Sequence, residues 1–383
     1  MGNLEIEELP SGVQAITGVA TSIALFIGWT PDGPTDRALR LFGFADYERN
    51  YGGLDSRSLL GYSVRHFYDN GGSDAYVMRI AGNDGAVIDP NDAGFHTALE
   101  SLFVAGGAVD SIELFNIICM PGLADAAAIQ AMQQRARERR AFLIVDCGEA
   151  DTVATVTGSL TGKIGADAPN SAFYFPWVIA SDPLQQNAPR AFPPCGFVAG
   201  ILARVDASRG VWKAPAGIEA LLAGSTGLAV DVNDAESGLL NPRAINSLRS
   251  FSAVGHVVWG ARTLDGDDSR GSEWKYVPVR RFALFLEQSI YSGTQWAVFE
   301  PNDEPLWAKI RRSVAVFMTT LFGQGAFQGA TVDRAWFVKC DRETTTQADI
   351  DGGVVNIVVG FAPLKPAEFV ILTIAQMAGP PLE

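Results

Sequence analysis

The stretch 96–146 decides the fold, and it reads HTALESLFVAGGAVDSIELFNIICMPGLADAAAIQAMQQRARERRAFLIVD. Apolar residues at helical spacing predict helices over 96–104 and 126–140. Short apolar runs predict strands over 113–120 and 141–146. Helices that alternate with strands in this way are typical of an α/β layer with a mostly parallel sheet.

The segments on both sides of this stretch extend the same pattern. Upstream, ATSIALFIGW predicts a buried strand over 23–27, and SRSLLGYSVRHFYDNGG predicts a helix that ends at Asn70, followed by the strand AYVMRI. Downstream, SAFYFPWVIA predicts one strand interrupted by Pro176. We therefore expect the α/β layer to occupy most of the first two thirds of the chain.

A second region of mixed α+β character is expected to start near Asn246. Apolar residues at helical spacing predict one helix over 282–290 and a longer one with Pro305 in its first turn. Arg311 and Arg312 lie off the apolar face of the longer helix and are expected to face outward. The chain then closes with three apolar segments, AWFVKCD, GVVNIVVGFAPL and EFVILTIAQM, which predict strands.

The expected organisation has four parts. Residues 1–20 form an extended arm, 21–245 an α/β domain with a mostly parallel sheet, 246–365 a mixed α+β domain, and 366–383 a second arm. A chain of 383 residues usually needs more than one core, which agrees with two packed domains.

Charge and composition favour a protein partner. The formal net charge of −14 disfavours attraction to nucleic acid phosphates and to anionic lipid heads. No apolar run approaches the roughly 20 residues that span a bilayer, and the first residues are acidic where a signal peptide is basic. We expect a chain made in the cytoplasm that binds no nucleic acid and inserts in no membrane.

No metal or cofactor site is expected. Cys119, Cys147, Cys195 and Cys340 are widely separated, which is typical of reduced core thiols. The three histidines have no neighbouring His or Cys at the spacing of metal ligands. The acidic loop around Asp267 lacks the spaced ligands of a calcium loop, so a solvated loop is the favoured interpretation.

Catalytic motifs match only in part. The segment AGSTG around Ser225 resembles a nucleophile elbow but has alanine at the first glycine, so a serine hydrolase on an α/β scaffold is kept as the alternative function. The segment GSLTGKI lacks a residue of the phosphate-binding loop, and the glycines of GQGAFQG follow a predicted helix instead of a strand. The sequence therefore predicts a protein that is not an enzyme.

One stretch is much more specific. Residues 192–217, FPPCGFVAGILARVDASRGVWKAPAG, resemble the signature of contractile tail sheath proteins, found in phage tails, injection systems and bacteriocin-like particles. TSIALFIGWTPDGP, FYDNGGSDAYVMRI, VVWGARTL, WAVFEPNDEPLW and FVKCDRETTT follow the family order around it. The signature residues are Arg209, Gly210, Val211, Trp212, Lys213, Ala214 and Pro215.

The resemblance implies a structural role. Sheath subunits stack as hexameric rings around an inner tube and contract to drive it through a target envelope, with the α/β domain outside and the later domain near the tube. The implied partners are further copies of the chain, the tube protein, and baseplate and tail-terminator or cap proteins.

Terminal arms of the family link neighbouring subunits by strand exchange. The candidate arm residues are Leu4, Ile6 and Leu9 at one end and Phe369, Val370, Ile371, Leu372 and Ile374 at the other. The alternative for the second arm is a strand within its own domain. The first arm departs from the family, because only MGN precedes LEIEELPSG.

Overall fold

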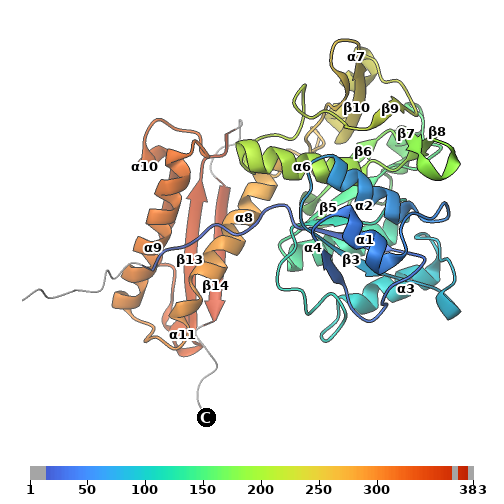
Figure 1. Ribbon diagram of the computed structural model, residues 1–383. Helices are drawn as coiled ribbons and strands as arrows, with labels where there is room; N and C mark the ends of the chain where they lie inside the picture. Colours follow the sequence, from blue (N-terminus) through green and yellow to red (C-terminus); the bar gives the residue numbers. More distant parts are fainter. Residues whose placement is uncertain (1–13, 365–369, 378–383) are drawn as a thin grey trace, which may run out of the picture. The chain divides into compact units, whose positions relative to one another are not determined.

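A computed structural model describes residues 14–364 and 370–377 of the chain, with the side chains of 370–377 excepted. The chain divides into two compact units (Figure 1). Unit 2 comprises Ala20–Leu284, and unit 1 comprises Met1–Val19 together with Phe285–Glu383.

Unit 2 is built on an eight-stranded, mostly parallel sheet, which confirms the predicted α/β layer. Only its two edge pairs are antiparallel: β2 on β3, and β11 on β10. The strands, in spatial order, are β11 (Gly255–Val258), β10 (Ile245–Phe251), β6 (Ser171–Phe175), β5 (Phe142–Asp146), β4 (Ile117–Cys119), β1 (Ala24–Gly28), β3 (Ala75–Arg79) and β2 (Leu39–Leu41).

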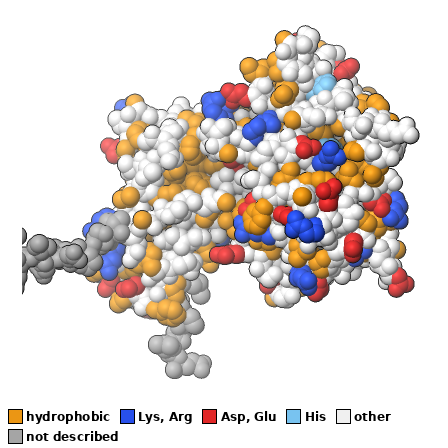
Figure 2. All heavy atoms as spheres, in the orientation of Figure 1, with side chains coloured by type: hydrophobic (Ala, Val, Ile, Leu, Met, Phe, Trp, Pro, Cys, Tyr) orange, Lys and Arg blue, Asp and Glu red, His pale blue; other side chains and the backbone are white. Residues whose placement is uncertain are grey.

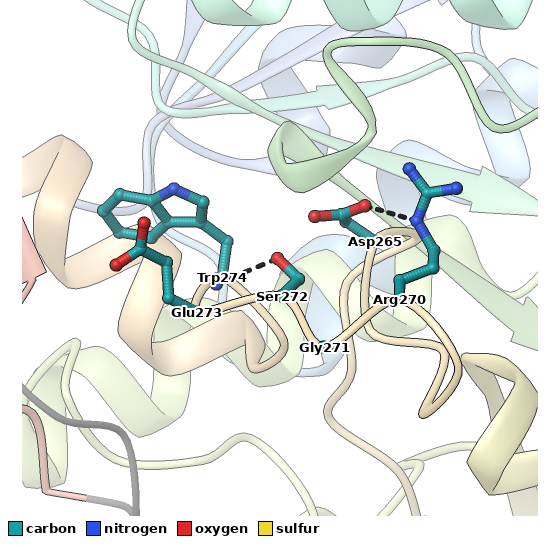
Figure 3. A pocket seen from close by; sticks show the side chains of 6 residues that line it. All are labelled: Asp265, Arg270, Gly271, Ser272, Glu273 and Trp274. Carbon is teal, nitrogen blue, oxygen red and sulfur yellow. Dashed lines mark hydrogen bonds and ion pairs between the residues drawn. The ribbon is translucent and has the colours of Figure 1, made fainter.

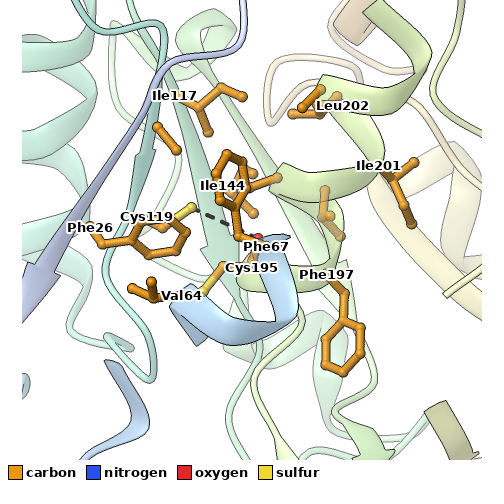
Figure 4. Close-up of a cluster of buried hydrophobic side chains, with 14 of the residues drawn as sticks. Phe26, Val64, Phe67, Ile117, Cys119, Ile144, Cys195, Phe197, Ile201 and Leu202 are labelled. Atoms are coloured by element: carbon orange, nitrogen blue, oxygen red, sulfur yellow. Dashed lines mark hydrogen bonds between the residues drawn. The ribbon is translucent and has the colours of Figure 1, made fainter. Parts of the chain in front are cut away.

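Helices cover both faces of this sheet, because strand side chains alternate between two apolar cores. Phe26 of β1 belongs to the core under α1 (Phe44–Tyr51), α2 (Leu59–Asp69) and α6 (Cys195–Arg209), part of which is drawn in Figure 4. Its neighbour Ile27 belongs to the opposite core, under α3 (Ala93–Leu102) and α4 (Ala126–Glu138). Unit 2 also contains the short helices α5 (Val156–Ser159) and α7 (Asp234–Leu240).

Helices α2 and α6 cross with their backbones in contact. A Cβ atom on Gly196 would lie 2.3 Å from the carbonyl oxygen of Ser63, and one on Gly200 would lie 2.5 Å from that of Phe67. Real Cβ atoms do not approach so closely, so only glycine fits at these two positions of α6. The spacing of four residues places both glycines on one face of the helix.

A smaller antiparallel sheet corrects one prediction. Residues 171–180 form two strands instead of one: β6 lies in the large sheet, and β7 (Val178–Asp182) lies between β8 (Ala188–Phe192) and β9 (Ser225–Leu228). Pro176 falls between them, and a residue without an N–H is a natural point for the chain to leave a sheet.

The division between the units also differs from the predicted boundary after Ile245. Asn246 lies inside β10, which pairs with β6 through Ile245, Asn246 and Ser247. The segment from there to Leu284 therefore belongs to unit 2. Helix α8 (Val277–Gly293) begins in unit 2 and ends in unit 1.

Unit 1 contains the predicted mixture of helix and sheet. Helix α9 (Glu304–Gly323) begins at Asp303, whose side chain accepts a hydrogen bond from the N–H of Leu306. It buries the expected face of Leu306, Ile310, Val314, Phe317 and Leu321. The antiparallel sheet consists of β12 (Trp336–Lys339), β13 (Val354–Phe361) and β14 (Val370–Met377), with short helices α10 (Val332–Ala335) and α11 (Gln347–Asp351) beside it in sequence.

Candidate functional site

The signature residues form a turn at the end of α6, packed against the start of α8. Gly210 has a φ of +89°, and a Cβ there would lie 2.4 Å from the indole of Trp212. Glycine thus lets the chain fold back on itself, and the indole packs edge-to-face on Phe282 of α8, with ring centroids 5.7 Å apart. We call the contact between the end of α6, this turn and the start of α8 the signature joint.

A buried ion pair holds the joint together. Arg281 of α8 donates two hydrogen bonds to the carboxylate of Asp206 on α6, at 2.9 and 2.6 Å. The two side chains are only 3% and 4% exposed. Arg281 also donates to the carbonyl oxygen of Thr21, at 2.8 Å. Both charges are therefore paired in a fork geometry that fixes the angle between the helices.

The other signature residues divide between core and surface. Val211 and Pro215 are buried, whereas Lys213 and Ala214 are partly exposed. Arg209 pairs with Glu219 at 2.8 Å, but both side chains are about half exposed, so this pair contributes little to stability. The sequence located the signature, but it did not identify Asp206 and Arg281 as partners. An available signal was Asp206 itself, a charged residue on a helix that is apolar over most of its length.

The other end of α6 rests on a buried carboxylate. Asp146, at the end of β5, accepts hydrogen bonds from the N–H of Cys195 at 2.8 Å and from that of Gly122 at 3.2 Å. Complete burial raises the pKa of Asp146 to about 7, although both N–H groups act in the opposite direction. Asp146 therefore supports the start of α6, and no serine or histidine bonds to it among the described residues.

The side chains of Ser225 and His256 are in contact, so the geometry of a serine hydrolase site can be checked directly. Ser225 Oγ lies 2.9 Å from His256 Nδ1 and donates to the carbonyl oxygen of Leu222 at 2.6 Å. Ser225 is the first residue of β9, whereas a nucleophile elbow needs a strand before the serine and a helix after it. Within the described chain no carboxylate pairs with His256. These contacts join β9 to β11 and do not form a catalytic triad.

The carboxylates of the acidic loop form ion pairs with nearby basic residues of the same chain. Asp265 pairs with Arg270, and Asp268 pairs with Arg262 and Lys275. The shallow surface hollow beside the loop is lined by Asp265, Arg270, Gly271, Ser272, Glu273 and Trp274 (Figure 3). Over residues 14–364 and 370–377, no group of His, Cys, Asp and Glu is arranged to hold a metal ion.

The four cysteines are free and buried, as expected of core thiols. Figure 2 shows acidic and basic side chains interspersed on the drawn face of unit 2, without a continuous basic patch there. Among the helices of the described chain, none combines the length and the apolar character needed to cross a bilayer.

The structure describes only some of the predicted arm residues. Leu4, Ile6, Leu9 and Phe369 lie outside the described residues. Val370–Met377 form β14, which pairs with β13 of the same chain from Val354↔Met377 to Phe361↔Val370. Within this single chain the strand therefore takes the alternative that the sequence left open.

The basic residues of α9 behave differently from one another. Arg311 is half-buried and bonds Glu304 and the carbonyl oxygen of Cys340. Arg312 is exposed, as predicted, and bonds only the carbonyl oxygen of Ala308 among the described residues. The exposed face of α9 thus carries Lys309 and Arg312 followed by Val316, which is 51% exposed.

Two family models match consecutive parts of the chain. The phage tail sheath protein central domain matches residues 105–264, and the phage tail sheath C-terminal domain matches residues 269–377. Together with the fold and the signature joint, these matches define a structural protein of a tail sheath.

Curated relatives agree with this class. The tail sheath protein of Vibrio phage KVP40 is 26% identical over 184 residues, and a putative prophage major tail sheath protein of Pseudomonas aeruginosa (strain UCBPP-PA14) is 27% identical over 186 residues. Each match covers 48% of this chain, but only 26% and 45% of the respective relative. The chain thus spans less than half the length of these two relatives.

Solved structures match over nearly the whole chain. A chain in the contracted sheath complex of an extracellular contractile injection system (PVC) is 30% identical, with a TM-score of 0.75 and coverage of 97% of this chain and 96% of that one. A chain in the baseplate structure of the anti-feeding prophage is 29% identical, with a TM-score of 0.75 and coverage of 98% and 99%. The chain belongs to the contractile tail sheath family.

Proposed function

We propose that the chain is a sheath subunit that polymerises as stacked hexameric rings around an inner tube and contracts to drive the tube through a target envelope. The observation that carries the proposal is the match to the contracted PVC sheath complex at 30% identity, over 97% of one chain and 96% of the other. Ser225, His256 and Asp146 form hydrogen bonds that hold the fold together, which supports a role without catalysis.

The two units take different places in the particle. Unit 2, which contains the predicted α/β domain, forms the outside of the sheath, and unit 1 lies near the tube. The exposed face of α9 supports this assignment, because Lys309 and Arg312 form no ion pair with described residues and stand in a chain of net charge −14. We propose that this face contacts an acidic surface of the tube.

Strand exchange links the copies in this proposal. Strand β14 leaves its own sheet and pairs with a neighbouring copy. The candidate arm residues for this exchange are Phe369, Val370, Ile371, Leu372 and Ile374, and those of the first arm are Leu4, Ile6 and Leu9. The antiparallel pairing along all of β13 supports the exchange, because the same main-chain hydrogen bonds form whether β14 comes from the same chain or from another. The exchange therefore costs few bonds and connects the lattice.

Contraction draws on energy stored during assembly. The sequence contains no phosphate-binding loop, so the proposal places the driving force in a metastable extended lattice. A few kcal/mol per subunit, roughly the size of one good interface contact, suffices when many identical contacts change together. A calorimetric measurement without heat release on contraction would contradict this part.

The remaining partners are baseplate and tail-terminator or cap proteins. The match to a chain in the anti-feeding prophage baseplate structure supports the first of these. The chain is made in the bacterial cytoplasm and ends in a virion tail or an injection-system particle.

Negative-stain electron microscopy of the concentrated protein, with and without tube protein, tests the proposal. Three chains are compared: full length, a truncation that removes 366–383, and a control that removes only 378–383 and keeps β14. Ring-stacked tubes from the full chain and the control, but not from the longer truncation, are expected. Tubes from all three chains would retain the sheath and exclude the second arm, whereas dispersed particles throughout, even with tube protein, would exclude the sheath function.

A further inference from the structure

Residues 14–21, which we call the strap, lie along α8. At one end, Gly293 makes room for Ile16: a Cβ atom on Gly293 would lie 2.7 Å from Cγ2 of Ile16 and 3.0 Å from its Cβ. Real Cβ atoms do not approach so closely, so only glycine lets the strap touch the helix there. Further along, a Cβ atom on Gly18 would lie 2.8 Å from Cζ of Phe285. A glycine on each partner thus allows the close packing.

Hydrogen bonds fix the strap at two further points. In unit 1, the N–H of Val19 donates to Oγ of Ser289 at 3.2 Å, and Ser289 is buried. In unit 2, the guanidinium of Arg281 donates to the carbonyl oxygen of Thr21 at 2.8 Å, and its ion pair with Asp206 holds the guanidinium in place. A neutral bond and a charge-assisted bond therefore hold the strap to the helix.

The contacts follow one another in order along the helix. Strap residues that come later in the chain touch α8 residues that come earlier, so the strap runs antiparallel to α8. From Arg281 to Gly293 the helix rises about 18 Å, at 1.5 Å per residue. From Ile16 to Thr21 an extended chain reaches about 17 Å, at 3.3 Å per residue. The agreement means that the strap is extended and seated on α8 from Ile16 to Thr21.

The strap stands between the first arm and the core of unit 2. Upstream are the candidate arm residues Leu4, Ile6 and Leu9, which lie outside the described residues. Downstream, β1 starts at Ala24 and pairs with β3 on one side and with β4 on the other. Every residue of β1 is buried. If the strap did not hold, a pull on the arm would act directly on a central strand of unit 2.

We propose that the strap is a tension anchor for the first arm, which passes a pull on the arm to α8 and the signature joint and keeps it away from β1. The proposal rests on the proposed function, in which a neighbouring copy holds this arm. Contacts spread along the direction of a pull share the force, whereas contacts loaded one after another break one at a time. The charge-assisted bond to Thr21 comes last on the way to β1, where a strong contact protects the core best.

Two variants of the full chain loosen the strap. Gly293→Ala places a methyl group against Ile16, and Ile16→Ala removes the apolar contact from the other side. Hydrogen exchange and thermolysin cleavage within residues 14–21 are expected to be about tenfold faster in both variants. The melting temperature of the dilute monomer is expected to stay within about 2 °C, because the core of unit 2 is unchanged. Gly323→Ala is the matched control, since Gly323 also ends a helix, α9, and has open space at its Cβ position.

A load on assembled tubes then separates an anchor from a merely structural contact. Tubes of each chain pass through a fixed flow shear, and negative stain gives their lengths. Tubes of Gly293→Ala and of Ile16→Ala are expected to be shorter by about twofold or more than tubes of the unchanged chain and of Gly323→Ala. Equal lengths, shortening in only one of the two variants, or exchange that neither variant accelerates would overturn the anchor while leaving the sheath function intact. Failure of the unchanged chain to assemble, even on tube protein, would overturn both.

Discussion

Replacing Asp206 with asparagine leaves the guanidinium of Arg281 buried without a counter-charge. The side chain of Arg281 is 3% exposed, so water cannot take the place of the carboxylate. Removal of one partner of a buried ion pair costs about 3–5 kcal/mol. At about 2–4 °C for each kcal/mol in a domain of this size, the melting temperature of unit 2 is expected to fall by roughly 6–20 °C.

A double-mutant cycle separates the energy of the ion pair from the effect of each single substitution. Asp206→Leu alone and Arg281→Met alone are each expected to cost a similar amount, because each leaves the charge of the other residue buried without a partner. Asp206→Leu combined with Arg281→Met is expected to recover most of the loss. About 1–3 kcal/mol remains lost in the double variant, since the carbonyl oxygen of Thr21 no longer receives its hydrogen bond from Arg281.

The assay is chemical and thermal unfolding of the dilute chain followed by tryptophan fluorescence. Arg209→Gln is the control, because it breaks an ion pair with about half-exposed partners and is expected to cost less than about 1 kcal/mol. A cost of Asp206→Asn no larger than that of this control, or a double apolar variant less stable than either single variant, would show that the ion pair does not stabilise the signature joint.

Two further predictions concern the contact of α6 with α2 and the carboxylate at the start of α6. Gly200→Ala places a methyl group 2.5 Å from the carbonyl oxygen of Phe67 and is expected to cost about 1–3 kcal/mol in urea unfolding. Gly238→Ala, in an open helical position, is the control and is expected to stabilise; equal effects of the two changes would contradict the close crossing. The pKa of Asp146 is about 7 in the folded chain, far above that of an unfolded aspartate, so the folded state binds the extra proton. The free energy of unfolding is therefore expected to fall as pH rises from about 4 to 7 and to level off above 7, by up to about 1.4 kcal/mol per pH unit, and Asp146→Asn is expected to flatten this dependence; an unchanged pH profile in that variant would remove Asp146 as the cause.

Periodicity and turn residues predicted the alternating elements of unit 2 and the long helix α9 correctly. These elements are set by local patterns, such as Asp303 and Pro305 at the start of α9. The boundary between the units was not predictable in this way. The strand over Ile245–Phe251 joins the large sheet by pairing with β6, which lies much earlier in the sequence, and nothing local distinguishes it from the start of a new domain.

The signature joint shows a similar limit. The motif from Arg209 to Pro215 was found through resemblance, which located the turn but gave no reason for its residues. The reason is the approach of α8, since Gly210 makes room for the indole of Trp212 and the indole meets Phe282. Phe282 is 70 residues further along the chain, and only the fold brings the two rings together.

The contact between α2 and α6 has a consequence for the accuracy of an assembly. Where two backbones touch through Gly196 and Gly200, no side chain remains between them to adjust, so the helices have one fitting position and cannot slide. In a helical polymer, an angular error in one subunit recurs in every layer and grows with the number of layers. In the proposed sheath, two residues without side chains thus hold α2 and α6 in the same position in every copy, as a long, straight tube requires.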